Sequence, residues 1–294
     1  MEEEFVTRAD LLLKCDIQNI LNNGIKDANP RPKYPDGTPA HTYFVTHNVR
    51  SYRLDKGEFP ICTLRSIGWK SAIKEILWIY QEQSNDLYLL NSKYGVKAWN
   101  KWESKDYPVT IGYRYGHTVK RYDLMNRLLK DIKENPYGRY HIMNLWQEEE
   151  FIDSDGLKPC AYETIWTVHG EYLDMLLVQR SGDMLVASGA GNWNEVQYAS
   201  LLMMVAKATG YKPCKFTHIV ANEQLYDRHI EQAKELVRRC EGLKSKGGQY
   251  DYEFDNVRIE FNPKTDNFYE FTINDFSLVG YEPMKPQLQF DLGI

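Results

Sequence analysis

The sequence lacks several features that would place the protein in a special class. It has no CxxC pair among its five cysteines, no apolar run approaching the roughly 20 residues that cross a bilayer, and no basic excess, since its net charge is −5. These absences argue against a zinc ribbon, a thioredoxin-type site, a membrane protein and a general nucleic-acid binder. The first ten residues, MEEEFVTRAD, are acidic and lack the apolar core of a signal peptide. We therefore expect a cytoplasmic protein with reduced thiols.

The chain also has no internal repeat and no low-complexity segment, and its length suits one large domain, expected over residues 1–294. Apolar residues at helical spacing predict helices over 66–83, 121–134, 194–210 and 222–241. Alternating residues predict a strand over 43–54, and two β-branched, apolar runs around HGE predict a β-hairpin over 160–181. Helices interleaved with antiparallel hairpins indicate an α+β fold with helices packed on one sheet.

Cys160, in the segment LKPCAYE, is the first residue that could carry chemistry. Taken alone, such a cysteine is more often a buried structural residue, and an isolated Arg180 would more often form a surface ion pair. The predicted hairpin, however, returns the end of its second strand, Gln179-Arg180-Ser181, to the side of Cys160. An arginine there would lower the thiol pKa. Together with the Ser181 hydroxyl it would also form an anion site.

The order of motifs along the chain resembles that of the thymidylate synthases. LKPCAYE is followed by QRSGD, by an Asn that opens a helix before Tyr198, and by EQLYDRH. The segments DGTPAHT, KEILWIYQ, WNKW, TIGYRYG, NPYGRYHI and FTINDFSLVGYEP also stand in the family's order, so the resemblance covers nearly the whole chain. It is nearest to the divergent bacillus and phage-type branch. The resemblance implies a thymidylate synthase-like α+β fold, with a mixed sheet, helices on one side and a sheet face at a dimer interface.

The resemblance also implies a specific reaction. This is folate-dependent one-carbon transfer to C5 of a pyrimidine deoxynucleotide, with dUMP methylated reductively to dTMP. Cys160 would add to C6 of the base, and 5,10-methylenetetrahydrofolate would be the co-substrate, with no metal required. The expected partners are a small nucleotide, a folate and a second copy of the chain, with no membrane and no obligatory nucleic acid. The location would be the host cytoplasm if the chain is phage-encoded.

The family's residue roles map onto individual positions. Glu75 would move protons at the pyrimidine, although a carboxylate on the polar edge of a surface helix is the plainer interpretation. Tyr115 would assist removal of the C5 proton, and Arg139 would bind the nucleotide phosphate in the other subunit's site. Other nucleotide contacts are implied for Arg31, Gln179, Arg180, Ser181, Gln224 and Tyr226, and folate contacts for Trp99, Trp102, Asp183 and Ile294, with Arg180 and Asp183 also in catalytic roles.

The chain departs from the family pattern at four places. Tyr140 stands where a second arginine is usual, Gln224 and Ala161 replace histidines, and ASGAGNWN replaces a shorter GLPFN loop. That loop would supply an asparagine whose amide pairs with O4 and N3–H of uracil. Asn192 and Asn194 are both candidates, and either could instead be a helix N-cap. The presence of asparagine at both positions favours uracil over cytosine.

Two alternatives to a synthase stay open on the sequence. A phage-type deoxypyrimidylate hydroxymethylase, acting on dUMP or dCMP, would use the same cysteine, arginine and glutamate, with water replacing hydride. The two tryptophans and the C-terminal FDLGI favour hydride transfer, whereas the remodelled loop and Gln224 favour the hydroxymethylase. A catalytically inactive nucleotide- or RNA-binding relative is less consistent with the joint presence of Cys160, Arg180, Ser181 and Glu75.

Overall fold

The computed structural model describes residues 6–243, 257–291 and 293. Its larger sheet has seven strands, in the order β1-β2-β7-β5-β4-β3 with β6 paired to β7, and β8 and β9 form a second, two-stranded sheet. The strands are β1 (Ile25–Lys26), β2 (Thr42–Arg53), β3 (Ile142–Asn144), β4 (Ala161–His169), β5 (Tyr172–Gln179), β6 (Gly182–Asp183), β7 (Lys212–Tyr226), β8 (Arg258–Phe261) and β9 (Phe276–Val279). The helices are α1 (Arg8–Asn23), α2 (Trp69–Ile76), α3 (Leu87–Tyr94), α4 (Gly116–Arg121), α5 (Leu124–Glu134), α6 (Glu148–Asp153), α7 (Trp193–Thr209) and α8 (Ile230–Gly242).

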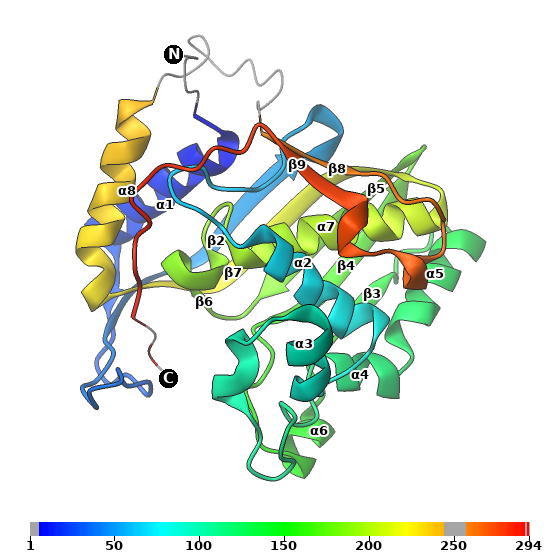
Figure 1. Ribbon diagram of the computed structural model, residues 1–294, viewed down its shortest axis with the longest axis horizontal. Coiled ribbons are helices and arrows are strands. Elements are labelled where there is room, and N and C mark those ends of the chain that lie inside the picture. Colours follow the sequence, from blue (N-terminus) through cyan, green and yellow to red (C-terminus); the bar gives the residue numbers. More distant parts are fainter. Residues whose placement is uncertain (1–5, 244–256, 292, 294) are drawn as a thin grey trace.

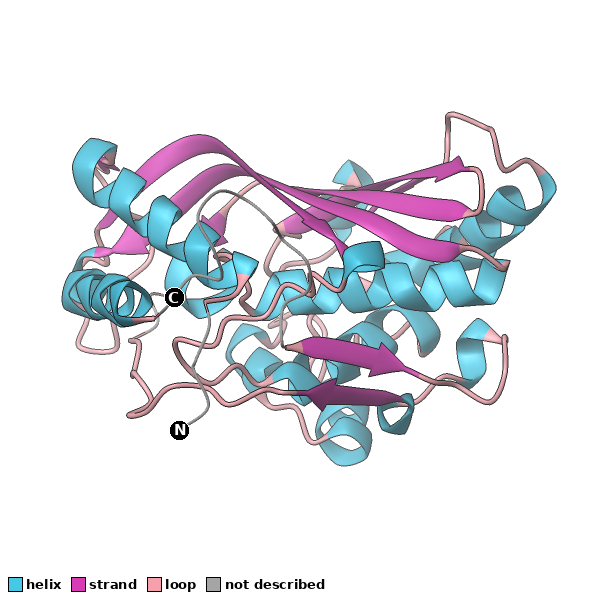
Figure 2. Cartoon of the chain, turned by 90° about the horizontal axis from the view of Figure 1, so that it is seen from above, coloured by secondary structure: helices cyan, strands magenta, loops and turns pink. Residues whose placement is uncertain are grey.

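Helix α7 forms the centre of the molecule. Figure 2 shows it between the seven-stranded sheet on one side and the β8–β9 pair on the other, and Figure 1 shows α2 beside it. A helix covered on both sides must be apolar around most of its circumference, and nearly every residue from Glu195 to Thr209 is buried. The helix ends at Gly210, whose φ of +83° is the left-handed conformation that favours glycine at this position.

The larger sheet is mixed. β5 and β6 run parallel to β7, and the other neighbouring pairs are antiparallel. Side chains alternate between a buried face toward α7 and an outer face that is partly exposed, as period-two alternation requires. Val49, Ile219 and Val178 stand side by side across three strands of the outer face, and Val49 is 54% exposed. The outer face of the single chain therefore carries a row of apolar side chains that are partly exposed.

The predicted α+β class is confirmed, as is the hairpin over 160–181, which forms as β4 and β5. The helix predicted over 66–83 forms α2 and continues as a π-helical turn over Leu77–Gln81. The helix predicted over 121–134 begins later, because Asp123 has a φ of +50° that separates α4 from α5.

The helix predicted over 222–241 is partly wrong. Residues 222–226 continue β7, and α8 begins only at Ile230. Among the described residues, no helix is both long and apolar enough to span a membrane. The assignment of the whole chain to one domain, the dimer interface on the sheet and the cytoplasmic location stay predictions.

Candidate active site

Cys160 lies directly before β4, where the hairpin register brings it beside Arg180. Ala161 pairs with Gln179, and the Arg180 backbone N–H donates to the Cys160 carbonyl at 2.9 Å. The Arg180 guanidinium reaches back to the Cys160 sulfur, with Nη2 and Sγ 3.5 Å apart. Nε and Nη2 also donate to the carbonyls of Pro159 and Lys158 at 2.9 and 2.8 Å, which fixes the guanidinium plane. The predicted contact between the thiol and the arginine is therefore present.

The pKa of the Cys160 thiol nevertheless differs from the sequence expectation. Burial raises it, and the positive charges of Arg180 and Arg31 only partly offset that effect. A thiol taken out of water disfavours its charged form, and one adjacent guanidinium recovers part of the lost solvation. In the free protein Cys160 is therefore mainly a thiol, and thiolate formation depends on further help at the site.

Tyr115 lies against Cys160 in an unusual backbone conformation. Its φ of +49° is rare for a residue with a side chain and occurs at the start of α4. The tyrosine hydroxyl oxygen accepts a hydrogen bond from the Cys160 backbone N–H at 3.1 Å. Burial strongly raises the pKa of Tyr115, so the phenol stays protonated. Backbone strain that places a hydroxyl beside a nucleophile is typical of functional sites.

An aromatic group extends the site away from Tyr115. The Trp99 ring lies edge-on to Tyr115 with centroids 5.1 Å apart, and edge-on to Trp102 at 5.6 Å. Trp99 is 8% exposed, whereas Trp102 is only partly buried. The structure thus places Trp99 beside Tyr115 and Trp102 beside Trp99, so the three rings form a continuous aromatic group.

Glu75 is buried in α2 with 5% of its surface exposed, so its interpretation as a surface carboxylate is wrong. It faces α7 and accepts a hydrogen bond from Trp193 Nε1 at 3.2 Å. Burial raises the pKa of Glu75, and hydrogen bonds from Gln197, Trp99 and Trp193 only partly offset this effect. A buried carboxyl group whose pKa is raised suits general acid–base catalysis.

The segment after Arg180 turns sharply above the end of β7. Asp183 starts a π-helical turn over Met184–Ser188, and its carboxylate accepts hydrogen bonds from the N–H groups of Leu185 and Val186. Burial outweighs these hydrogen bonds and raises the pKa of Asp183 to about 7. Asp183 can therefore present either a donor or an acceptor to a ligand near neutral pH.

The two candidate asparagines have different environments. Asn192 is fully buried at the N-cap position of α7, but its side chain does not cap the helix. Its Oδ1 accepts from Arg65 at 2.5 Å, and its Nδ2 donates to the Met184 carbonyl at 2.7 Å. Asn194 is only partly buried, and its Oδ1 accepts from Gln179 Nε2 at 3.3 Å. Asn194 thus lies beside Gln179, whereas Asn192 is occupied by the protein interior.

The end of β7 completes the site with polar side chains. Gln224 Nε2 lies 3.5 Å from Ser181 Oγ, because Asp183 pairs with Gln224 in the sheet. Tyr226 is 5% exposed, and a Cβ placed on Gly293 would lie 3.0 Å from its hydroxyl oxygen. The C-terminal segment therefore contacts Tyr226. Ile294 lies outside the described residues.

Two predicted arginines stand apart. Arg31 is exposed, yet its charge acts on both Cys160 and Tyr226, which places it in their vicinity. Arg139 is exposed between α5 and β3. Within the described part of the chain, Arg139 forms no hydrogen bond or ion pair with the other predicted site residues. One chain thus brings together the predicted residues except Arg139 and the undescribed Ile294.

Comparison with known proteins identifies the family to which this arrangement belongs. A family model described as thymidylate synthase matches residues 14–294. The chain belongs to the thymidylate synthase family. Thymidylate synthases of Lactococcus lactis subsp. lactis (strain IL1403) and Streptococcus pneumoniae (strain 70585) are each 47% identical to it, over 295 and 296 residues that cover 98% of this chain and 100% of those proteins. The thermostable thymidylate synthase A from Bacillus subtilis superposes with a TM-score of 0.84 at 33% identity, covering 97% of this chain and 99% of that one.

The predicted resemblance to thymidylate synthases is thus confirmed, and so is the thymidylate synthase-like fold. Beneath the site, this chain also holds a buried charge cluster that the sequence analysis missed. Arg50 of β2 donates to Glu195 at 2.6 Å and to Asp16 and Glu223 at 2.8 Å each. His218 joins the cluster, with Nδ1 3.0 Å from Glu195 Oε1.

This charge cluster, defined by Arg50, Asp16, Glu195, Glu223 and His218, is linked to Gln179 and Asn194. His218 Nε2 lies 3.0 Å from Gln179 Oε1, and Gln179 in turn donates to Asn194. Burial raises the pKa of Glu223 to about 7, while for Glu195 the nearby Arg50 and His218 outweigh burial and lower its pKa to about 2. Through His218, the charge cluster therefore fixes the orientation of the Gln179 side chain.

Arg65 is a further buried residue that no sequence pattern indicates. It is 7% exposed, donates to Asn192 and to the Leu185 carbonyl, and its guanidinium lies 4.8 Å from the centre of the Phe290 ring. It connects the loop before α7 to the C-terminal segment. An arginine in the stretch CTLRS carries no sequence signal for such a role, because its partners are more than 100 residues away.

Proposed function

We propose that the protein methylates dUMP reductively to dTMP, with 5,10-methylenetetrahydrofolate as the co-substrate. The observation that carries this proposal is Cys160, whose sulfur lies 3.5 Å from the Arg180 guanidinium and whose backbone N–H donates to the Tyr115 hydroxyl. The relatives named above are all thymidylate synthases, which favours methyl transfer over the hydroxymethylase alternative.

The nucleotide would lie with its phosphate at the polar end of the site. Hydrogen-bond donors are offered there by Arg180, Ser181 and Gln224, and the positive charge of Arg31 lies nearby. The Tyr226 hydroxyl would contact the sugar. Asn194 would pair with O4 and N3–H of uracil, because its amide lies beside Gln179 while Asn192 already has two protein partners.

Covalent catalysis would begin at Cys160. The Cys160 thiol first loses its proton to solvent. The thiolate sulfur then forms a bond to C6 of the base, and the π electron pair of the C5–C6 bond moves toward C5 and O4, so that C5 becomes nucleophilic. Arg180 stabilises the attacking thiolate, and the protonated form of Glu75 supplies a proton on the O4 side of the ring. The Tyr115 hydroxyl, which lies against the Cys160 backbone, would assist removal of the C5 proton to solvent. Breaking the S–C6 bond at the end restores Cys160.

The apolar wall and Asp183 fit a folate. Trp99 and Trp102 present aromatic surface for the flat rings, and Asp183, with a pKa of about 7, can bond to a pterin nitrogen. When bound, methylenetetrahydrofolate supplies both the one-carbon unit and the hydride. The protein would exclude water from C5 of the base. We propose that the C-terminal segment, which contacts Tyr226 at Gly293, contributes to this exclusion.

The active unit would be a homodimer. The outer face of the sheet carries the row Val49, Ile219 and Val178, which a second copy would cover. Arg139 is exposed and remote from its own chain's site, so we propose that it binds phosphate in the partner's site.

The product identifies the reaction. The protein is incubated with dUMP, dCMP, UMP or CMP plus methylenetetrahydrofolate, and the mass of each nucleotide product is measured by mass spectrometry. We expect a methyl product from dUMP, none from the Cys160→Ser variant, and dihydrofolate as the second product. A hydroxymethyl product, or undiminished turnover by Cys160→Ser, would refute the proposal.

Sharing of residues across the dimer has its own test. Arg139→Ala and Cys160→Ser chains, each expected to be nearly inactive, are mixed, partly unfolded and refolded together. Random pairing should restore about a quarter of wild-type activity, because half of the dimers contain one complete site. If activity does not rise on mixing, Arg139 does not bind phosphate in the site of the other subunit.

A further inference from the structure

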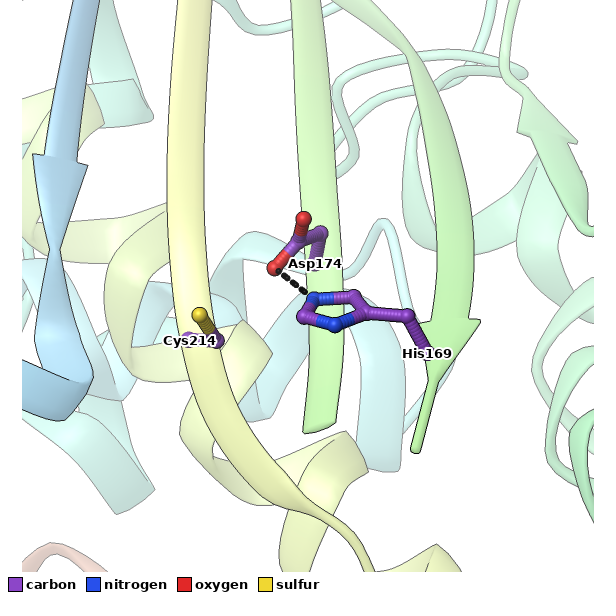
Figure 3. A group of neighbouring side chains, drawn as sticks. All are labelled: His169, Asp174 and Cys214. Atoms are coloured by element: carbon purple, nitrogen blue, oxygen red, sulfur yellow. Dashed lines mark hydrogen bonds and ion pairs between the residues drawn. The ribbon is translucent and has the colours of Figure 1, made fainter. Parts of the chain in front are cut away.

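Three metal-binding side chains meet on the outer face of the sheet, at the end of the β4–β5 hairpin. They are His169 of β4, Asp174 of β5 and Cys214 of β7, and their ligand atoms all lie within 4.8 Å of one another. Figure 3 shows the imidazole reaching across β5 toward the carboxylate, with the thiol on the next strand. His169 Nε2 and Asp174 Oδ1 are 3.1 Å apart.

A β-bulge creates this meeting point. Leu173 pairs with Pro213 and Met175 with Phe216, so two residues of β7, Cys214 and Lys215, stand opposite the single residue Asp174. Such a bulge redirects side chains, and here it accompanies a thiol and a carboxylate on the same side of adjacent strands. The close approach of the Cys214 thiol and the Asp174 carboxylate therefore depends on the bulge.

Two of the three groups are already oriented by other contacts. Asp174 Oδ1 accepts a hydrogen bond from the Lys215 backbone N–H at 2.9 Å, and the His169 ring stacks on Tyr172 with centroids 5.7 Å apart. Carboxylate ligands of metals are commonly held in this way by a backbone donor. In the single chain Cys214 is buried and His169 is exposed. Asp174 lies four residues before Val178 in β5, roughly 13 Å along the strand from the row that a second copy would cover.

The local charge favours a cation. Asp55 lies near Cys214 as well and is paired with Arg53, whose Nε donates to Asp55 Oδ1 at 2.7 Å. Asp174 and Asp55 thus both place a carboxylate near the Cys214 sulfur. With Cys214 ionised, three negative charges would face the single positive charge of Arg53. A divalent cation would supply the two missing charges.

We propose that His169, Asp174 and Cys214 bind a divalent metal ion of zinc type, with water as the fourth ligand. One nitrogen, one carboxylate oxygen and one sulfur donor form a mixed set that Zn²⁺ accepts in tetrahedral geometry. Neighbouring ligands around Zn²⁺ are about 3.3–3.7 Å apart, so the widest separation closes by about 1 Å. Binding releases the Cys214 proton to solvent.

The metal would join three strands and take no part in methyl transfer. Cys160 precedes the first residue of β4 and His169 is its last, which separates them by roughly 30 Å along the strand. The site instead connects β4, β5 and β7, which are neighbours in the sheet. It is independent of the proposed function, and its test does not use activity.

Cobalt binding provides the test. Full-length protein is stripped with a chelator, kept reduced with a phosphine and titrated with Co²⁺, and the thiolate-to-cobalt charge-transfer band is recorded with the metal-to-chain ratio. We expect one ion per chain, proton release on binding, and competition by Zn²⁺. The band should disappear in Cys214→Ser, and the affinity should fall at least about tenfold in His169→Ala, which is exposed and leaves the fold intact.

Two cysteine variants control for other thiols. The exposed Cys15 and the active-site Cys160 are each changed to serine, and the band should persist in both. Absence of the band in the wild-type protein, its persistence in Cys214→Ser, or full affinity in His169→Ala would overturn the proposal. If Cys214→Ser fails to fold by circular dichroism, Asp174→Asn and His169→Ala decide, because neither removes a fully buried group.

Discussion

Changing Asn194 to aspartate should alter base selection. The Asn194 amide is held by Gln179 at 3.3 Å and by Gln197 at 3.0 Å, which leaves one donor hydrogen and one lone pair for uracil. A carboxylate at position 194 keeps the hydrogen bond from Gln179 but cannot donate to O4 of uracil. A carboxylate oxygen and O4, both acceptors, would then face each other. An unpaired acceptor of this kind costs about 1–3 kcal/mol, so kcat/KM for dUMP should fall about 5- to 150-fold. The N4 amino group of cytosine can donate to the same carboxylate, so kcat/KM for dCMP should rise relative to dUMP.

The matched control is Asn192→Asp, two residues earlier. Asn192 accepts from Arg65 and donates to the Met184 carbonyl, and aspartate would preserve only the first bond. We expect lower stability with an unchanged ratio of kcat/KM for dUMP and dCMP. The assay follows dihydrofolate absorbance with each nucleotide at saturating methylenetetrahydrofolate. A shifted ratio in Asn192→Asp together with an unshifted ratio in Asn194→Asp would refute the assignment.

Three further changes test the interior of the site. Arg50→Met should lower the free energy of unfolding by about 3–5 kcal/mol in urea titrations, because buried carboxylates lose their counter-charge; a smaller loss than for an ordinary core truncation would contradict this. Asp183 has a pKa raised to about 7 when folded, so the unfolded chain binds fewer protons between about pH 4 and 7, and stability falls as pH rises through that window. Asp183→Asn should remove this slope, worth at most about 4 kcal/mol, and an unchanged slope would assign it elsewhere. Gly191→Ala should cost about 1–3 kcal/mol by thermal unfolding, because φ is +68° and a Cβ would lie 2.4 Å from the Cys62 nitrogen; an unchanged melting temperature would mean that the loop relaxes.

Local sequence patterns were sufficient where neighbours in the chain are also neighbours in space. The hairpin around HGE predicted that Arg180 returns to Cys160, and the register of β4 and β5 shows that contact. The direction of the thiol pKa could not be predicted in the same way. It depends on how much protein surrounds Cys160, and that depends on distant segments.

Long-range polar pairing explains the errors. Glu223 in NEQLY gives the end of β7 a polar pattern that resembles a helix start, but its carboxylate is buried against Arg50, 173 positions away. A strand can bury a charge only when a partner exists, and the sequence does not show the partner. The plainer interpretation of Glu75 as a surface carboxylate fails for the same reason, since Trp193 covers it from another helix.

The most direct test of methyl transfer compares two products of a single reaction. dUMP carrying tritium at C5 is incubated with the protein and methylenetetrahydrofolate, and released tritium and dihydrofolate are counted together. We expect equal amounts of the two throughout the reaction, and neither with Cys160→Ser. Tritium release that is accompanied by tetrahydrofolate in place of dihydrofolate would show that water replaces hydride, and would contradict the proposed function.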